Sequence, residues 1–195
     1  MSFRYDIRLS GSGGQGLILM GLILAEAIGI YDGKQVALTQ SYGPEARGGT
    51  SKAEVVVSDA EIDYPKAMAL DLLLCLNQKS CDEYYLDLKP DGLLIVDSTL
   101  VHQVPVPGAC QIPFTRIARD KLKREMAANI VALGAIAKLT TIVTPKALER
   151  ALLARVPRGT EQLNLAALKA GMTAAMKARR VKRTQIIRER EDEDT

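Results

Sequence analysis

A run of glycines near the amino terminus has the spacing of a loop that binds an anion. Gly11, Gly13 and Gly16 satisfy the pattern G-x-G-x-x-G, in which glycines permit a tight turn and a close approach of the backbone to a phosphate. Gly14 removes one more side chain, and the amide of Gln15 could reach a phosphate or a ribose hydroxyl. Glycines that only permit a tight turn between a strand and a helix are the simpler alternative.

The segments around this loop fit a nucleotide-binding fold. Residues 3–9 alternate apolar and polar side chains like a strand, and residues 17–30 have the length of a helix. The loop would therefore open a helix, whose first N–H groups and dipole favour a phosphate. A site for NAD also needs an acidic residue at the end of the second strand, where residues 37–40 read Ala-Leu-Thr-Gln. The missing carboxylate argues against NAD.

A second polar loop, at residues 39–51, follows the next expected strand. In a doubly wound sheet this loop lies at the same edge as the glycine loop, where ligands bind. Glu45 and Arg47 are its charged side chains, and Gly48 and Gly49 follow directly. We predict that Arg47 either binds a phosphate or fixes the loop against a partner subunit. An ion pair of Arg47 with Glu45 alone is the alternative.

The sequence predicts a single open, mostly parallel, doubly wound α/β sheet of the Rossmann type with a helical C-terminal third. A buried strand without alternation is expected at residues 70–76, and a further strand ends at Asp97, which could bind a hydroxyl or cap a turn. Lys-Pro-Asp-Gly at residues 89–92 reads as a turn. The other expected strands are 35–38, 52–57 and 110–112, and the later helices are 78–88, 115–139, 145–154 and 161–179.

Length and charge favour one cytoplasmic domain. The chain has 195 residues, of which 47% are hydrophobic and 4% aromatic, and its net charge is +3. This composition argues against a nucleic-acid binder, and the most apolar segment, residues 17–30, is too short to span a membrane. We expect residues 1–180 to form one domain and the charged residues 181–195 to be disordered.

The cysteines do not have the spacing of a metal site. Cys75, Cys81 and Cys110 lack a C-x-x-C pair, and His102 is the only histidine that could assist them. Buried reduced thiols are therefore expected, with no zinc or iron–sulfur site in this chain. His102 itself has no positioned nucleophile in the sequence and receives no role.

Three segments together resemble the gamma subunit of 2-oxoacid:ferredoxin oxidoreductases, especially those for 2-oxoglutarate or branched 2-oxoacids. They read Gly-Ser-Gly-Gly-Gln-Gly at 11–16, Ser-Tyr-Gly-Pro-Glu-Ala-Arg-Gly-Gly at 41–49 and Asn-Ile-Val-Ala-Leu-Gly at 129–134. The second segment is the most specific of the three. The resemblance runs from about residue 7 to about residue 153.

The resemblance implies a subunit that is not active alone. In such enzymes a 2-oxoacid is decarboxylated on thiamine diphosphate, iron–sulfur clusters carry electrons to ferredoxin, and coenzyme A accepts the acyl group. The alpha, beta and ferredoxin-like subunits would hold the thiamine diphosphate and the clusters. The gamma unit would pack against them and form part of the coenzyme A pocket, with Asn129 near that shared pocket.

Two other functions stay open at this point. The small subunit of an indolepyruvate oxidoreductase resembles this chain in its glycine loop but lacks the run at 43–49. A stand-alone nucleotide-binding or regulatory module is the third possibility. Neither the 2-oxoacid nor the stoichiometry of a complex can be inferred from these motifs.

Overall fold

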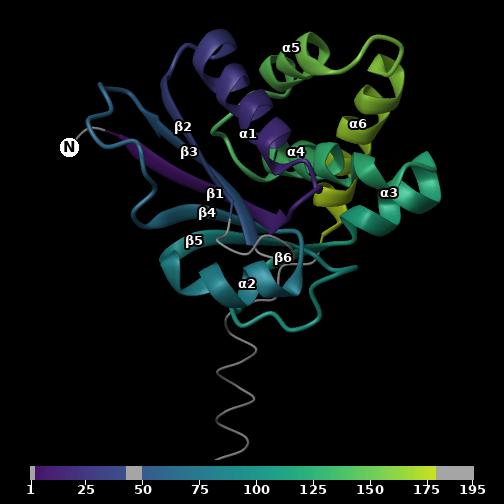
Figure 1. Cartoon of the computed structure of the whole chain (residues 1–195), viewed down its shortest axis with the longest axis horizontal. Coiled ribbons are helices and arrows are strands. Elements are labelled where there is room, and N and C mark those ends of the chain that lie inside the picture. Colours follow the sequence, from purple (N-terminus) through teal and green to yellow (C-terminus); the bar gives the residue numbers. More distant parts are fainter. Residues whose placement is uncertain (1–2, 43–49, 179–195) are drawn as a thin grey trace, which may run out of the picture.

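A computed structural model of the chain describes residues 3–42 and 50–178, so the tail at 181–195 lies outside the described residues. Its centre is one six-stranded sheet with the order β2-β3-β1-β4-β5-β6 (Figure 1). The strands are β1 (Arg4–Ser12), β2 (Gln35–Tyr42), β3 (Thr50–Ser58), β4 (Leu70–Cys75), β5 (Leu88–Asp97) and β6 (Cys110–Ile112). The α/β class and the single open sheet are as predicted.

One strand runs against the other five. β1, β4, β5 and β6 pair in parallel, and β3 is antiparallel to both of its neighbours, β1 and β2. The sheet is therefore mixed, with β2 and β3 forming a hairpin at one edge. A hairpin needs only a short connection, whereas a parallel crossover needs a helix between the strands. Residues 43–49, which join β2 to β3, are too few for such a helix.

Helices cover both faces of the sheet. On one face lie α1 (Leu17–Glu26), which continues as a π-helical turn over Ala27–Tyr31, and α3 (Phe114–Leu122), α4 (Ala128–Leu139), α5 (Pro145–Arg155) and α6 (Glu161–Lys177) (Figure 1). α2 (Gln78–Tyr84) packs on the other face, followed by a 3₁₀ turn at Tyr85–Asp87, and a second 3₁₀ turn at Glu125–Ala127 leads into α4. No helix in the described part of the chain is long and apolar enough to cross a membrane.

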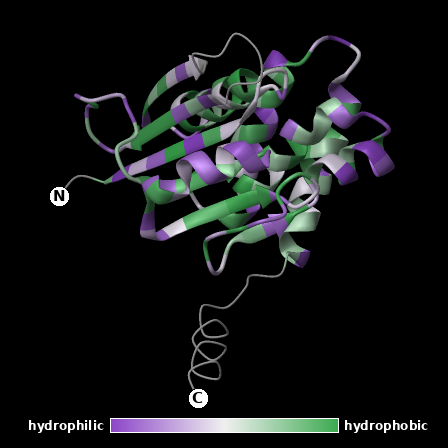
Figure 2. Cartoon of the chain, turned by 60° about the horizontal axis from the view of Figure 1, so that its bottom comes forward, coloured by the Kyte–Doolittle hydropathy of each residue, from purple (hydrophilic) through white to green (hydrophobic). Residues whose placement is uncertain are grey.

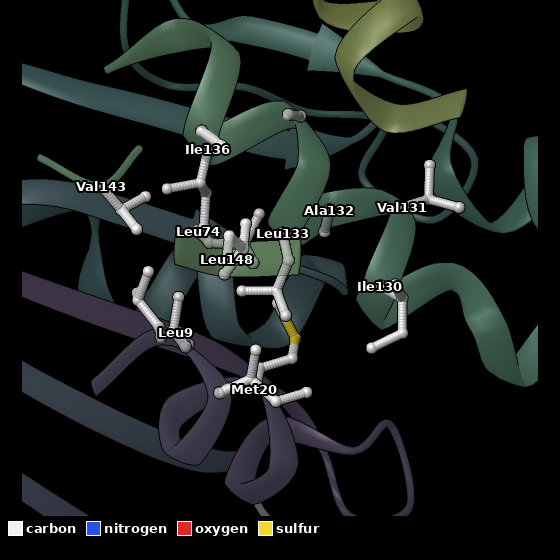
Figure 3. Close-up of a cluster of buried hydrophobic side chains, with 14 of the residues drawn as sticks. Leu9, Met20, Leu74, Ile130, Val131, Ala132, Leu133, Ile136, Val143 and Leu148 are labelled. Carbon is white, nitrogen blue, oxygen red and sulfur yellow. The ribbon is translucent and has the colours of Figure 1, made fainter. Parts of the chain in front are cut away.

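The main core lies between the sheet and the larger helical layer. Figure 3 shows Leu9 of β1, Leu74 of β4, Met20 of α1, Leu133 of α4 and Leu148 of α5 gathered in one cluster, and all five are fully buried. In Figure 2 hydrophobic segments gather along the strands and inner helices. A smaller core joins α2 to β4 and β5 on the opposite face. β4 contributes to both cores, which explains its continuous run of leucines.

α4 is the central helix, and it touches α6 at two glycines. Every residue from 129 to 137 is buried, so this helix has no polar face. A Cβ at Gly134 would overlap the carbonyl oxygen of Leu168, and a Cβ at Gly171 would overlap that of Val131. Residues 129–137 are therefore part of the core.

Two sequence expectations about local structure were wrong. Residues 89–92, expected as a turn, belong to the first half of β5, where the pairing with β4 shifts register between Leu70 and Leu72. Such a bulge accommodates proline and glycine within a strand. The helix expected over 115–139 is divided, because Lys123 has a left-handed backbone with φ of 56° and ends α3. The predicted start of α5 is confirmed, with the Thr144 side chain accepting from Ala147 N.

Candidate functional site

The glycine loop lies at the point where the connections of the sheet diverge. β1 ends at Ser12, α1 begins at Leu17, and the chain then proceeds to the β2 and β3 side. β4, the other neighbour of β1, leads to the β5 side, and Leu76 N donates to Ser10 O at 2.9 Å just beyond its end. In open α/β sheets this crevice at the carboxyl ends of the strands is the usual ligand site.

Gln15 holds the loop in shape. Its Oε1 accepts from Ser12 N at 2.6 Å, and its Nε2 donates to Leu76 O at 3.2 Å. Both ends of the amide are therefore bonded within the chain, to β1 and to the segment that follows β4. In this structure Gln15 therefore fixes the loop. The sequence analysis had instead suggested that its amide reaches a phosphate or a ribose hydroxyl.

The glycines of the loop divide into two pairs with different roles. A Cβ at Gly11 would overlap Oε1 of Gln15, and a Cβ at Gly16, where φ is 74°, would overlap Nδ2 of Asn129. A side chain at either position would therefore require Gln15 or Asn129 to move. A Cβ at Gly14 would have no atom within 4 Å, and one at Gly13 would lie 3.9 Å from Ser51 Oγ. Gly13 and Gly14 thus leave open space in front of the backbone, although Gly14 also has a left-handed backbone, with φ of 86°, that favours glycine.

Asn129 lies against the glycine loop although it is distant in sequence. It is 7% exposed, and its Oδ1 accepts from Ile130 N at 2.8 Å near the start of α4. Its Nδ2 is the atom that closely approaches Gly16. The structure therefore brings together Asn129 and the glycine loop, two of the three segments that carried the family resemblance.

A small pocket opens beside the loop. Its volume is about 180 Å³, and its walls include Gly14, Gln15, Leu76 and Asn129. Two apolar residues of the pocket are exposed, Met126 to 86% and Leu100 to 38%. The pocket is smaller than the sites that usually enclose a ligand of drug size, which have volumes of about 300–1,000 Å³. It can enclose only part of a large cofactor.

Asp97 has a structural role at the back of this pocket. The side chain is fully buried, its Oδ2 accepts from Thr115 N at 3.0 Å, and its Oδ1 accepts from Thr99 N at 2.9 Å. The hydroxyl of Thr115 donates to the same carboxylate. Of the two roles left open by the sequence, the structure shows the turn and cap role, which ties β5 to the start of α3.

The second loop reaches the same edge through its flanking residues. Glu45, Arg47, Gly48 and Gly49 lie outside the described residues. Thr50, the first residue of β3, pairs with Ser12 at the end of β1. The first residue after the second loop therefore lies directly beside the start of the glycine loop. This agrees with the expectation that the two motifs lie at the same edge of the sheet.

The sequence analysis missed Asn77, which connects the glycine loop to α2. Its Oδ1 accepts from Ser80 N at 2.8 Å as the N-cap of α2, and its Nδ2 donates to Ser12 Oγ. An asparagine directly before a helix is a recognised cap signal. Its second bond, to a residue 65 positions away, has no local signal.

All three cysteines are buried and form no disulfide, in agreement with the sequence prediction. Cys75 and Cys81 are hydrogen-bonded neighbours. This bond, followed by burial, raises the pKa of Cys75, and the same bond lowers the pKa of Cys81 although burial acts to raise it. No group of three or more His, Cys, Asp or Glu side chains suited to a metal occurs within residues 3–42 and 50–178.

Comparison with known proteins agrees with the motifs. Residues 6–174 match the family described as pyruvate ferredoxin/flavodoxin oxidoreductase. The chain belongs to this family. The 2-oxoglutarate synthase subunit KorC of Methanocaldococcus jannaschii is 49% identical over 179 residues, which cover 90% of this chain and 96% of KorC. KorC of Methanothermobacter thermautotrophicus is 43% identical, with 91% of this chain and 98% of KorC covered.

Solved structures of the family share the fold. A gamma subunit of a keto/oxoacid ferredoxin oxidoreductase from Geobacter sulfurreducens is 48% identical, with a TM-score of 0.84 over 90% of this chain and 98% of that one. The 2-oxoglutarate:ferredoxin oxidoreductase of Magnetococcus marinus, solved with 2-oxoglutarate, coenzyme A and succinyl-CoA, has a TM-score of 0.79. At 23% identity, with 92% of this chain and 32% of that one covered, it supports the fold alone. The predicted gamma-type subunit of a 2-oxoacid oxidoreductase is confirmed.

Proposed function

We propose that this chain is the gamma subunit of a 2-oxoglutarate:ferredoxin oxidoreductase. The complex would oxidatively decarboxylate 2-oxoglutarate to succinyl-CoA and pass the electrons to ferredoxin. The choice of 2-oxoglutarate as substrate is supported by the 49% identity to a 2-oxoglutarate synthase subunit along 96% of its length. Ketoisovalerate oxidoreductase subunit VorA of Methanothermobacter thermautotrophicus is more distant, at 38% identity over 134 residues. Branched 2-oxoacids are therefore the second candidate.

The glycine loop is proposed to bind the phosphate end of coenzyme A. The loop opens α1, and the N–H groups at the start of a helix favour an anion. Gly13 and Gly14 place no side chain in front of the backbone, so a phosphate can approach closely. Two carboxylates line the pocket beside the loop. Asp97 accepts hydrogen bonds from Thr115 and Thr99, and Glu125 is the second carboxylate.

Coenzyme A would be shared between this chain and a partner subunit. The pocket beside the loop is too small for the whole cofactor, and the exposed Met126 and Leu100 would be covered if a partner completed it. Arg47, Glu45, Gly48 and Gly49 are proposed to complete the phosphate site from the second loop. Alpha, beta and ferredoxin-like subunits are the proposed partners, and they would hold the thiamine diphosphate and the iron–sulfur clusters.

Purification of the native complex tests the subunit role. We expect the chain to co-purify with the thiamine-binding and ferredoxin-like subunits, identified by mass spectrometry. The complex should reduce a viologen dye in the presence of coenzyme A, fastest with 2-oxoglutarate among a panel of 2-oxoacids. The isolated chain should show no such activity. Turnover by the isolated chain would contradict the subunit role, and a preference for a branched 2-oxoacid would contradict the proposed substrate.

Replacement of Arg47 by alanine tests the second loop. If its guanidinium binds a phosphate, the KM for coenzyme A should rise about tenfold or more, because a charge-assisted hydrogen bond contributes roughly 1.5–3 kcal/mol. The KM for 2-oxoglutarate and the elution volume of the complex on gel filtration should not change. Loss of this subunit from the complex would show instead that Arg47 acts at the subunit interface. Unchanged assembly and kinetics would remove Arg47 from the site.

A further inference from the structure

α2 contacts the glycine loop at its N-terminal end. Asn77, its N-cap, satisfies Ser80 N with its Oδ1 and donates from Nδ2 to Ser12 Oγ. Ser12 is the last residue of β1 and pairs with Thr50 in β3. One side chain therefore fixes both the start of α2 and the first residues of the glycine loop.

The C-terminal end of α2 contacts the start of β3. Thr50 Oγ1 donates to Glu83 Oε2 at 2.6 Å and lies 3.0 Å from the hydroxyl of Tyr84. Because the single proton of Thr50 is used for Glu83, Tyr84 is the donor in the second bond. Thr50 is 6% exposed and Tyr84 is 8% exposed, so this bond is shielded from water.

The charges around Tyr84 hold it in this position. The guanidinium of Arg8 lies 4.8 Å and the ammonium of Lys52 lies 5.2 Å from the centre of the Tyr84 ring. Arg8 is fixed in turn by Glu54, with Nε to Oε1 at 2.8 Å, and by Asp87. The aromatic ring thus lies within cation–π distance of two cations that belong to β1 and β3.

The protonation states agree with this arrangement. Burial is the main effect on the Tyr84 hydroxyl, and together with the nearby Glu83 it raises the pKa of Tyr84 to about 12. Desolvation acts to raise the pKa of Glu83, but the bond from Thr50, the nearby hydroxyl of Tyr84 and the charges of Lys79 and Lys52 outweigh it, so the net pKa is lowered. At neutral pH Tyr84 is therefore a donor and Glu83 an acceptor.

We propose that α2 is a brace that holds the glycine loop in its working position, through Asn77 at one end and Glu83 and Tyr84 at the other. These are positioning residues, since they act through Ser12, the last residue of β1, and through Thr50, which pairs with Ser12 on β3. The proposal rests on the proposed coenzyme A site, because the glycine loop that the brace holds is assigned to that cofactor.

Three substitutions remove the bonds with little change in shape. Thr50→Val removes the hydroxyl that bonds to Glu83 and Tyr84, Tyr84→Phe removes one partner, and Asn77→Ser keeps an N-cap but is too short to reach Ser12. Thr50→Ser, which keeps the hydroxyl, is the conservative rescue. Thr173→Val is the matched control, because Thr173 on α6 bonds only locally, to Lys169 O at 2.9 Å.

The test measures steady-state kinetics of the assembled complex carrying each variant. We expect Thr50→Val to raise the KM for coenzyme A about three- to tenfold, from the loss of one or two hydrogen bonds, with the KM for 2-oxoglutarate unchanged. Tyr84→Phe and Asn77→Ser should follow in the same direction, whereas Thr50→Ser and Thr173→Val should remain near wild type. A merely structural role would lower the melting temperature without this selective change.

Comparison with Gly13→Val distinguishes a failure of the brace from a failure of the proposed coenzyme A site. If Gly13→Val raises the KM for coenzyme A and all three brace variants keep the wild-type value, the brace is wrong while the cofactor site stands. If Gly13→Val also keeps the wild-type value, the cofactor site fails and the brace fails with it. Dissociation of the Thr50→Val subunit from the complex would likewise overturn the brace, by assigning these bonds to assembly.

Discussion

Replacement of Gly171 by alanine is expected to lower the free energy of unfolding by about 3 kcal/mol, at the upper end of what one added methyl group in a packed core does. The new Cβ would overlap the carbonyl oxygen of Val131 in α4. The obstacle is backbone, so α6 as a whole must move away from α4. These helices share the most extensive helix–helix contact in the described part of the chain, and the movement would disturb packing along its length.

The measurement is thermal unfolding of the purified chain, followed by circular dichroism. A loss of this size should lower the melting temperature by about 10 °C in a protein of this length. Gly134→Ala should behave similarly, because its Cβ would overlap Leu168 O from the other side of the same contact. Gly29→Ala is the control, since its Cβ would have Val36 at an ordinary 3.7 Å. Equal melting temperatures for Gly171→Ala and Gly29→Ala would contradict the close crossing of α4 and α6.

The order of strand, glycine loop and helix could be predicted because each step has a local signal. Alternating side chains indicate β1, glycines mark the turn, and an apolar run of helical length follows. The start of α5 was equally readable, because Thr144 and Pro145 form a cap that depends on neighbours only.

The direction of β3 was missed although it has a local signal, because the short connection at residues 43–49 favours a hairpin. The position of Asn77 could not be predicted in the same way, because its bond to Ser12 joins residues 65 positions apart. The bulge at residues 89–92 shows the opposite error: proline and glycine there read as a turn, yet pairing with β4 carries the chain on as a strand. Tertiary contacts outweighed a local preference at this point.

The glycine motif itself shows where sequence reasoning ends. The pattern could not distinguish glycines that serve a turn from glycines that make room for a ligand. In the structure Gly11 and Gly16 are confined by Gln15 and Asn129. Gly14 has open space but a left-handed backbone with φ of 86°, and Gly13 has open space without such a backbone. Gln15, which the sequence suggested as a ligand contact, belongs with the first pair because both ends of its amide are bonded internally.

This division makes Gly13→Val the most direct test of the proposed coenzyme A site. A Cβ at Gly13 would have its nearest neighbour 3.9 Å away, and the backbone there is not left-handed, so the folded subunit should tolerate the side chain. In the complex, valine would occupy the space through which a phosphate reaches the backbone N–H groups. Loss of such charge-assisted bonds, at roughly 1.5–3 kcal/mol each, corresponds to tenfold or more in affinity.

The deciding measurement is therefore the KM for coenzyme A of the assembled complex with Gly13→Val, compared with wild type at saturating 2-oxoglutarate. We expect an increase of about tenfold or more, with assembly, melting temperature and the KM for 2-oxoglutarate unchanged. Gly13→Ala should give a smaller increase in the same direction. A complex that assembles normally and keeps the wild-type KM for coenzyme A would show that the glycine loop is only a turn and that coenzyme A binds elsewhere.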